Sequence, residues 1–218
     1  MSNDIIIAGV GGQGTVLASR LIAYAAMLEG KTVRTAETIG MSQRGGSVLG
    51  YIRIFSDDDG YAPLSPMIYS GQADLLMAFE PAEAARNLHL LKAGGSLVTA
   101  CKGIMPIQAQ LAKDPSEVYD VEKLLAWLEA KSTAADLPAY QAYLIDGEAI
   151  LEKLGSGRVL NVVLLGVAIA TGALAISEDS LVSAIQALAP ARYLEMNIKA
   201  LGEGKAQANE RPTMGADT

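Results

Sequence analysis

The stretch DIIIAGVGGQG, residues 4–14, decides the fold of this chain. Its apolar half runs directly into a glycine cluster, in which Gly9, Gly11 and Gly14 fit the pattern G-x-G-x-x-G and Gly12 is an additional glycine. A helical pattern follows at once. A strand, a tight glycine turn and a helix N-terminus bring backbone N–H groups and the positive end of the helix dipole together, so the stretch predicts an anion site. The same glycines would also suit a turn that only needs close packing, and both interpretations stay open here.

The composition favours one domain of alternating strands and helices. Of the 218 residues, 50% are apolar but only 5% are aromatic, so the core must be built from Ala, Val, Ile and Leu. We therefore predict an α/β fold of three layers, α/β/α, with a mostly parallel or mixed sheet and a Rossmann-like first βαβ unit. Residues 1–204 are expected to form a single domain, and residues 205–218, which are small and polar, a disordered tail.

Charge and hydropathy exclude several classes of protein. The net charge is -7 and the basic residues are not clustered, which argues against nucleic-acid binding. No signal-peptide pattern opens the chain, so a cytoplasmic location is expected. Residues 159–176 carry no charge, but Asn161, Gly166 and Gly172 interrupt them, and we predict a buried helix rather than a membrane span. Asn161 then needs a hydrogen-bond partner, either in the glycine loops or at the start of its own helix.

Cysteine and histidine usage limits the chemistry further. Cys101 and His89 are the single residues of their types, so no intrachain disulfide and no usual zinc site can form. An iron–sulfur cluster needs about four thiolates, and this chain alone cannot supply them. His89 lies among leucines in a predicted helix and is interpreted as an ordinary surface residue. We predict no catalytic residue and no metal ligand.

The elements after the first turn predict a dinucleotide-binding type of unit. Residues 15–29 have helical spacing, and residues 31–37 are typical of a second strand. Glu37 lies near the end of that strand, where nicotinamide-binding folds keep an acid for the ribose. From these residues alone, an independent NAD(P)-binding oxidoreductase is one interpretation.

The next stretch, TIGMSQRGGS at residues 38–47, favours a different function. This polar loop precedes a predicted strand at 47–55, which is a candidate for an antiparallel addition to the sheet. An arginine followed by two glycines places a planar cation beside exposed N–H groups, an arrangement suited to anions. The simpler interpretation is a connection whose arginine is solvated. The candidate binding residues of this loop are Ser42, Gln43, Arg44, Gly45 and Gly46.

The second half of the chain predicts further strand and helix pairs. A strand at 74–80 precedes a helix that begins at Pro81 and is expected to stop at Gly94 and Gly95, before a strand at 96–101. Further predicted elements are a helix at 121–131, a strand at 141–146, and helices at 147–155, 177–190 and 191–204. This alternation supports a mainly parallel sheet.

GVGGQG followed by ETIGMSQRGGSV resembles the gamma subunits of 2-oxoacid:acceptor (ferredoxin) oxidoreductases. Within that family, the GMSQRGGSV stretch is most similar to the indolepyruvate branch. The resemblance runs from residue 4 to residue 204, and EMNIKALGEG at 195–204 is similar to the closing helix of the family.

The resemblance implies a subunit of an enzyme that decarboxylates a 2-oxoacid on thiamine diphosphate, and the indolepyruvate branch favours indolepyruvate or another aryl pyruvate as this 2-oxoacid. Electrons would pass through [4Fe-4S] clusters to ferredoxin, and the product would be an acyl-CoA. Since this chain lacks a thiamine motif and the thiolates, thiamine diphosphate, magnesium and the clusters are expected on a partner subunit of a hetero-oligomer, and the isolated chain is expected to be inactive. Coenzyme A is the ligand expected at the loops, while a non-catalytic scaffold is the remaining alternative. The expected binding residues are Gly9, Gly11, Gly12, Gln13, Gly14, Ser42, Gln43, Arg44, Gly45, Gly46 and Asn161.

Overall fold

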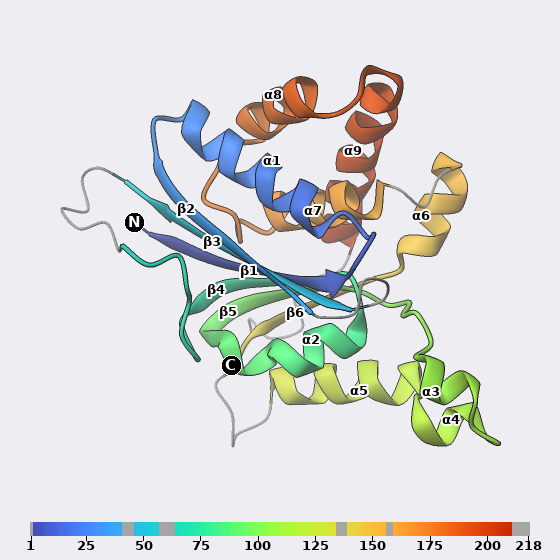
Figure 1. Cartoon of the computed structure of the whole chain (residues 1–218). Coiled ribbons are helices and arrows are strands. Elements are labelled where there is room, and N and C mark those ends of the chain that lie inside the picture. Colours follow the sequence, from blue (N-terminus) through green and yellow to red (C-terminus); the bar gives the residue numbers. More distant parts are fainter. Residues whose placement is uncertain (1, 41–45, 57–63, 134–138, 156–158, 211–218) are drawn as a thin grey trace.

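A six-stranded sheet lies between two layers of helices (Figure 1). The structure, a computed structural model, describes residues 2–40, 46–56, 64–133, 139–155 and 159–210. The strands are β1 (Asn3–Val10), β2 (Thr32–Ile39), β3 (Ser47–Phe55), β4 (Ala73–Ala78), β5 (Leu91–Ala100) and β6 (Gln141–Ile145). The helices are α1 (Thr15–Leu28), α2 (Pro81–Asn87), α3 (Ile107–Gln110), α4 (Pro115–Val118), α5 (Val121–Ser132), α6 (Gly147–Leu154), α7 (Leu160–Ala170), α8 (Glu178–Leu188) and α9 (Leu194–Glu210), with short 3₁₀ turns η2 (Leu88–Leu90) and η4 (Ala191–Tyr193).

The strand order is β2-β3-β1-β4-β5-β6, and the sheet is mixed. Strands β1, β4, β5 and β6 are parallel neighbours, while β3 pairs antiparallel with both β1 and β2. The predicted three-layer α/β fold is confirmed, including the antiparallel strand at 47–55. The first βαβ unit is present as well, but β3 lies between its two strands.

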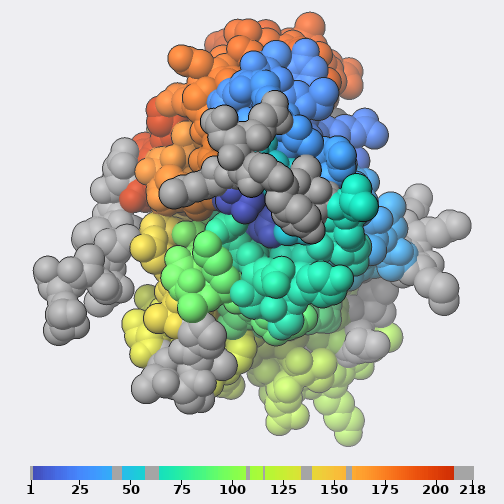
Figure 2. Space-filling model, turned by 90° about the vertical axis from the view of Figure 1, so that its left-hand side faces the viewer, coloured from blue at the N-terminus to red at the C-terminus, as the bar shows by residue number. Residues whose placement is uncertain are grey.

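Strand β1 owes its central place to its apolar side chains. Ile5, Ile6 and Ile7 are each 0% exposed. Alternate residues point to opposite faces of a strand, so Ile5 and Ile7 join the core cluster under α1 and α7, and Ile6 joins the cluster on the opposite face. Helices α1, α7, α8 and α9 cover the first face and α2 and α5 the second (Figure 1). In the space-filling view, the first layer (blue and orange) and the α2 side (green) occupy opposite ends of the molecule (Figure 2).

Two glycines expected to stop a helix instead belong to a strand. Helix α2 ends at Asn87, and β5 already begins at Leu91, so that Gly94 and Gly95 lie inside it. Gly94 has a φ of 72°, and the β4–β5 register shifts between Ala73 and Leu75. The prediction was wrong because a positive φ serves a bulge in a strand as well as the end of a helix.

The C-terminal helices differ in length from their predictions. Helix α7 ends at Ala170, earlier than the predicted 159–176, because Gly172 follows with a φ of 70°. Helix α9 continues to Glu210, so residues 205–210 are helical and not part of a tail, since Ala208 packs against the core. Residues 211–218 lie outside the described residues. None of the helices in the described ranges combines the length and apolar character needed to cross a membrane.

Glu29 connects the end of α1 to the start of α8. Its carboxylate accepts hydrogen bonds from the Lys31 ammonium at 2.7 Å and from the backbone N–H of Ser177 at 2.6 Å. Burial by itself would raise the pKa of Glu29, but these hydrogen bonds outweigh it and lower the pKa to about 2. A carboxyl with a depressed pKa stabilises the fold above its unfolded-state pKa and loses that contribution as the pH falls towards the folded-state pKa.

We therefore expect Glu29→Gln to lower the free energy of unfolding at pH 7 by about 1–2 kcal/mol. The deficit relative to the natural chain should shrink as the pH falls from about 4.5 towards 2, where the natural carboxyl is also protonated. Denaturant titrations at pH 7, 4.5 and 3.5 measure it, with Glu152→Gln on the exposed side of α6 as the control. A deficit that does not change with pH would show that the charge of Glu29 is not responsible.

Candidate functional site

The candidate site lies at the carboxyl ends of β1 and β4. From β1 the chain continues through α1 on one face of the sheet, and from the neighbouring β4 it continues through α2 on the other face (Figure 1). Two parallel neighbours whose connections leave in opposite directions form a crevice, which is where open α/β sheets bind ligands. Gln13 follows β1 and Glu80 follows β4, and the Gln13 amide donates a hydrogen bond to Glu80 across this point.

The first glycine loop, residues 9–14, has glycines with different roles. A Cβ at Gly9 would lie 2.8 Å from the Phe79 ring and 2.9 Å from Gln13 Oε1, so this position has no room for a side chain. Gly14, the N-cap of α1, has a φ of 87°, and a Cβ there would lie 2.8 Å from Asn161 Nδ2. Gly12 has a φ of 99° but no heavy atom within 4 Å of its Cβ position. Packing therefore requires Gly9 and Gly14, whereas Gly12 is needed only for its backbone conformation.

In the second glycine loop, residues 38–47, the described residue Gly46 contacts the first loop. The Gly11 N–H donates to the Gly46 carbonyl at 3.0 Å, and the Gly40 N–H donates to the Ser47 carbonyl at 2.9 Å. The structure thus brings Gly46 and the first glycine loop together. Four other predicted residues of this loop lie outside the described residues, namely Ser42, Gln43, Arg44 and Gly45.

Asn161 lies beside the first glycine loop at the start of α7. Its side chain is buried, with 2% of the residue exposed, and its Oδ1 accepts a hydrogen bond from the Val162 N–H at 3.0 Å. Its Nδ2 faces the Cβ position of Gly14. The Asn161 side chain therefore contacts both places considered from the sequence, the first glycine loop and the start of its own helix.

Glu37 lies away from this crevice. It belongs to β2, the edge strand, and its neighbour across the ladder is Gly50 of β3. Because β3 separates β2 from β1, Glu37 does not follow the strand next to the glycine turn, as the ribose-binding acid of a Rossmann fold does. The sequence could not reveal this insertion, since it depends on which distant strand pairs with β1.

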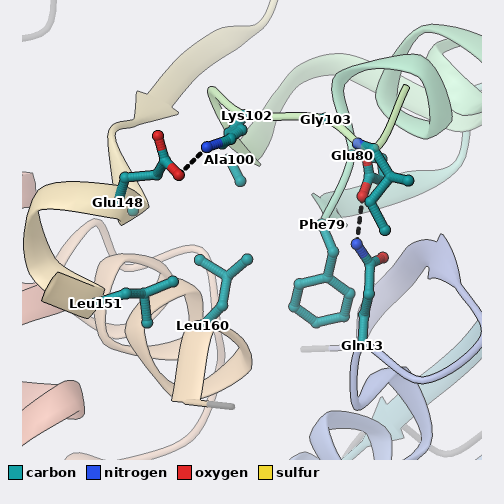
Figure 3. Close-up of a pocket in the computed structure, with 11 residues that line it drawn as sticks. Gln13, Phe79, Glu80, Ala100, Lys102, Gly103, Glu148, Leu151 and Leu160 are labelled. Carbon is teal, nitrogen blue, oxygen red and sulfur yellow. Dashed lines mark hydrogen bonds and ion pairs between the residues drawn. The ribbon is translucent and has the colours of Figure 1, made fainter. Parts of the chain in front are cut away.

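Beside Gln13 the crevice opens into a cavity of about 200 Å³ (Figure 3). Phe79, Leu151 and Leu160 form its apolar walls, and an ion pair between Lys102 and Glu148 lies across from them (Figure 3). Both partners of the ion pair are more than half exposed, so it contributes little stability. In the described residues, no group of three or more His, Cys, Asp or Glu side chains is placed to hold a metal ion.

Glu80 is the buried carboxyl of the site and is 4% exposed. Its Oε2 accepts a hydrogen bond from the Ile104 N–H at 2.7 Å, and its Oε1 accepts one from Gln13. Burial raises the pKa of Glu80 above its ordinary value and the charge of Glu83 adds to the rise, while the two hydrogen bonds act in the opposite direction. The group is thus able to hold a proton at a higher pH than an exposed carboxyl.

Tyr119 places a hydroxyl group close to this carboxyl. In the described part of the chain, its oxygen is the one buried side-chain polar atom without a hydrogen-bond partner. A Cβ at Gly103 would overlap the Tyr119 hydroxyl and lie 3.0 Å from Glu80 Oε2, so both groups border the same glycine. Burial raises the pKa of Tyr119, and the charge of Glu80 raises it further.

Sequence analysis missed Glu80, Glu83 and Tyr119. Glu80 was interpreted only as the end of a strand, although a polar residue after a buried strand is where ligand sites of open sheets occur. The position of Glu80 directly after a buried strand was therefore the signal that could have identified it. Glu83 and Tyr119 carry no motif, and their role emerges only from the packing of α2 and of the segment before α5.

The mixed sheet with helices on both faces matches the fold of a small subunit of a 2-oxoacid:ferredoxin oxidoreductase. The gamma subunit of a keto/oxoacid ferredoxin oxidoreductase from Geobacter sulfurreducens matches with a TM-score of 0.66 and 25% identity, covering 96% of this chain and 99% of that one. The family model of the pyruvate ferredoxin/flavodoxin oxidoreductases matches residues 4–207, and the chain belongs to this family.

Curated relatives point to one branch of the family. The indolepyruvate oxidoreductase subunit IorB of Archaeoglobus fulgidus is 35% identical over 210 residues, which cover 95% of this chain and 96% of the relative. That of Pyrococcus horikoshii is 34% identical over 209 residues, with the same coverage of 95% and 96%. The resemblance stated from the sequence is confirmed, and so is the class of a 2-oxoacid oxidoreductase subunit.

Proposed function

We propose that this chain is the small subunit of a 2-oxoacid:ferredoxin oxidoreductase that acts on indolepyruvate or a similar aryl pyruvate. The observation that carries the proposal is the similarity of 34–35% to two indolepyruvate oxidoreductase subunits along nearly the whole chain. The reaction would convert the 2-oxoacid and coenzyme A into an acyl-CoA and carbon dioxide, with two electrons passing to ferredoxin.

The catalytic cofactors would belong to a partner subunit in a hetero-oligomer. This chain has one cysteine, whereas a [4Fe-4S] cluster needs about four thiolates. Thiamine diphosphate with its magnesium ion, and the clusters, are therefore assigned to the partner. A cytoplasmic location and ferredoxin as the electron acceptor remain predictions of the same proposal.

The part proposed for this chain is to hold the phosphate-bearing end of coenzyme A at the two glycine loops. Three features support it: the Gly11–Gly46 hydrogen bond that joins the loops, the helix N-terminus that follows Gly14, and Arg44 in the predicted loop. Backbone N–H groups and a guanidinium are the donors that phosphates prefer. The proposed binding residues are the glycines of both loops with Gln13, Ser42, Gln43, Arg44 and Asn161.

Two alternatives predict different results. An independent NAD(P)-binding oxidoreductase would need an acid next to the first loop, but Glu37 lies on an edge strand that β3 separates from β1. A pure scaffold would use both loops only for packing against the partner subunit. The first alternative predicts saturable NADH or NADPH binding by the purified chain, and the second predicts normal turnover of loop variants that assemble.

Arg44→Ala tests the proposal in the complex of this chain with its catalytic partner subunit. We expect the KM for coenzyme A to rise about tenfold to a hundredfold, because a charge-assisted contact to phosphate is lost, while kcat at saturating coenzyme A changes little. Steady-state assays with indolepyruvate as the 2-oxoacid and a viologen as the acceptor measure both constants.

Arg34→Ala is the matched control, because Arg34 is an exposed arginine on the edge strand β2. It should leave the KM for coenzyme A unchanged. An Arg44→Ala complex that assembles and has an unaltered KM would show that the second glycine loop is structural and would favour the scaffold.

A further inference from the structure

Helix α2 begins next to the two glycine loops, and two buried carboxyls at its start accept hydrogen bonds from residues of these loops. Glu80 is its N-cap and Glu83 lies in its first turn. The two residues are only 4% and 2% exposed, which is rare for carboxylates unless they are paired. Being three residues apart at a helix start, they point to the same side of the helix.

Glu80 joins the first glycine loop to the segment 101–106. Gln13 Oε1 accepts a hydrogen bond from the Val10 N–H at 2.8 Å, which fixes the orientation of the amide and presents its nitrogen to Glu80. The second oxygen of Glu80 accepts from the Ile104 N–H at 2.7 Å. Two donors therefore converge on Glu80, and an ionised carboxylate is the side chain that accepts from both without offering a donor of its own.

Glu83 holds the end of the second glycine loop. Its Oε2 accepts a hydrogen bond from the Ser47 hydroxyl at 2.6 Å, and its other oxygen pairs with Arg86. Ser47 directly follows Gly46, whose carbonyl accepts the N–H of Gly11. Through these bonds, the two carboxyls together fix three segments: the first glycine loop, the end of the second, and residues 101–106.

We propose that Glu80 and Glu83 are positioning residues, which set the spacing of the two glycine loops without touching the ligand. The inference rests on the proposed function, in which these loops hold an anion. A carboxylate that contacted a phosphate would repel it, but both of these carboxylates are buried and directed at donors within the chain. Their role is to order the loops before the anion arrives, so their loss should weaken binding more than turnover.

Exchanging the amide and the carboxylate tests the Glu80 part of the proposal. In Glu80→Gln, one of the two donors loses its acceptor, because a glutamine side chain has a single oxygen. In Gln13→Glu, two carboxyls face each other, and they repel unless one of them takes up a proton. In the double variant, Glu at 13 accepts from Val10 and from Gln at 80, whose oxygen accepts from Ile104, so all three hydrogen bonds return.

We expect each single variant to raise the KM for coenzyme A about tenfold in the complex with the catalytic partner subunit, with kcat at saturation within about twofold. Amide hydrogen exchange of residues 9–14 and 101–106 should accelerate about tenfold in the same complexes, measured without coenzyme A. The double variant should return the exchange rates to within about threefold of the natural complex, and exchange is the readout for this variant because Gln13 is itself a proposed binding residue.

Ser47→Ala tests the Glu83 part, since it removes one hydrogen bond from an exposed residue of the second glycine loop. Exchange should rise in residues 40–47 and not in residues 101–106. Glu178→Gln, in an ion pair with Lys205 on the other side of the sheet, is the control and should change neither loop.

Two results would overturn the inference: a double variant no better than the worse single variant, or single variants that behave as the Glu178→Gln control does. The exchange measurement keeps this outcome separate from the proposed function. If coenzyme A does not bind at the loops, the KM values will not respond, but ordering of the loops by Glu80 and Glu83 still shows in hydrogen exchange.

Discussion

Gly204→Ala should lower the free energy of unfolding of this chain by about 3 kcal/mol or more, the largest effect that we expect of any single methyl group here. Helices α7 and α9 cross at a backbone-to-backbone contact. A Cβ at Gly204 would overlap the Val163 carbonyl, and one at Gly166 would overlap the Leu201 carbonyl. Neither neighbour is a flexible side chain, so the two helices would have to separate and expose part of the core that they share.

Gly202→Ala provides the matched control on the same helix. No heavy atom lies within 4 Å of the Cβ position of Gly202, so alanine meets nothing there. Alanine is the better helix former, and this variant should be as stable as the natural chain or more stable by up to about 1 kcal/mol. Denaturant titrations of the two variants make the comparison. Equal stabilities would mean that α7 and α9 are not in backbone contact.

Features that depend on neighbouring residues were mostly predictable from the sequence, whereas features that depend on contacts between distant segments were not. The strand at 47–55 and the helix predicted at 177–190, which is α8, were correctly predicted, because apolar runs and helix caps such as Ser177 are local signals. The placement of β3 between β1 and β2 was not, since strand order depends on pairing between distant segments. Gly94 shows the limit of a local signal. This glycine was expected to end a helix, but its positive φ belongs to a bulge in β5.

The candidate site was likewise predictable from the sequence only in part. Its two glycine loops are recognisable in the sequence as motifs, and the structure brings Gly11 and Gly46 into contact. The carboxyls of Glu80 and Glu83, which hold these loops, belong to no sequence motif. Glu80 and Glu83 matter because the start of α2 packs under the loops, and only the fold determines which loops a short helix will meet.

Trp127 provides a further example from the opposite face. Trp127 lies in the helix predicted at 121–131 and is 42% exposed, whereas Leu128 beside it is fully buried. Periodicity identified the helix but not the side on which it rests, because α5 has only a weak apolar stripe.

Gly14→Ala should have the second largest effect, with a loss of about 3 kcal/mol of stability that is concentrated at the start of α1. The residue has a φ of 87°, a region that costs an alanine about 1–2 kcal/mol. The new methyl group would also lie 2.8 Å from Asn161 Nδ2, a close contact that adds about 1–3 kcal/mol. The first turn of α1, where the proposed anion site has its donors, would be displaced.

Two further variants separate the strain from the contact. Gly12→Ala has the strain alone, because the φ of Gly12 is 99° and its Cβ position is open, so its loss should be about half as large. Asn161→Ala removes the atom that the methyl group would meet. The double variant Gly14→Ala/Asn161→Ala should therefore be more stable than the sum of the two single losses by about 1 kcal/mol or more.

The same set of variants distinguishes a binding loop from a packing loop. If the donors at the start of α1 hold the phosphate-bearing end of coenzyme A, the KM should rise in Gly14→Ala, and it should stay high in the double variant even as stability recovers, because Asn161 is itself a proposed binding residue. A double variant whose KM recovers in step with stability would show that Asn161 does not contribute to binding. Strictly additive losses in the double-mutant cycle would mean that the methyl group added at position 14 does not contact Asn161. The packing described at this loop would then be wrong.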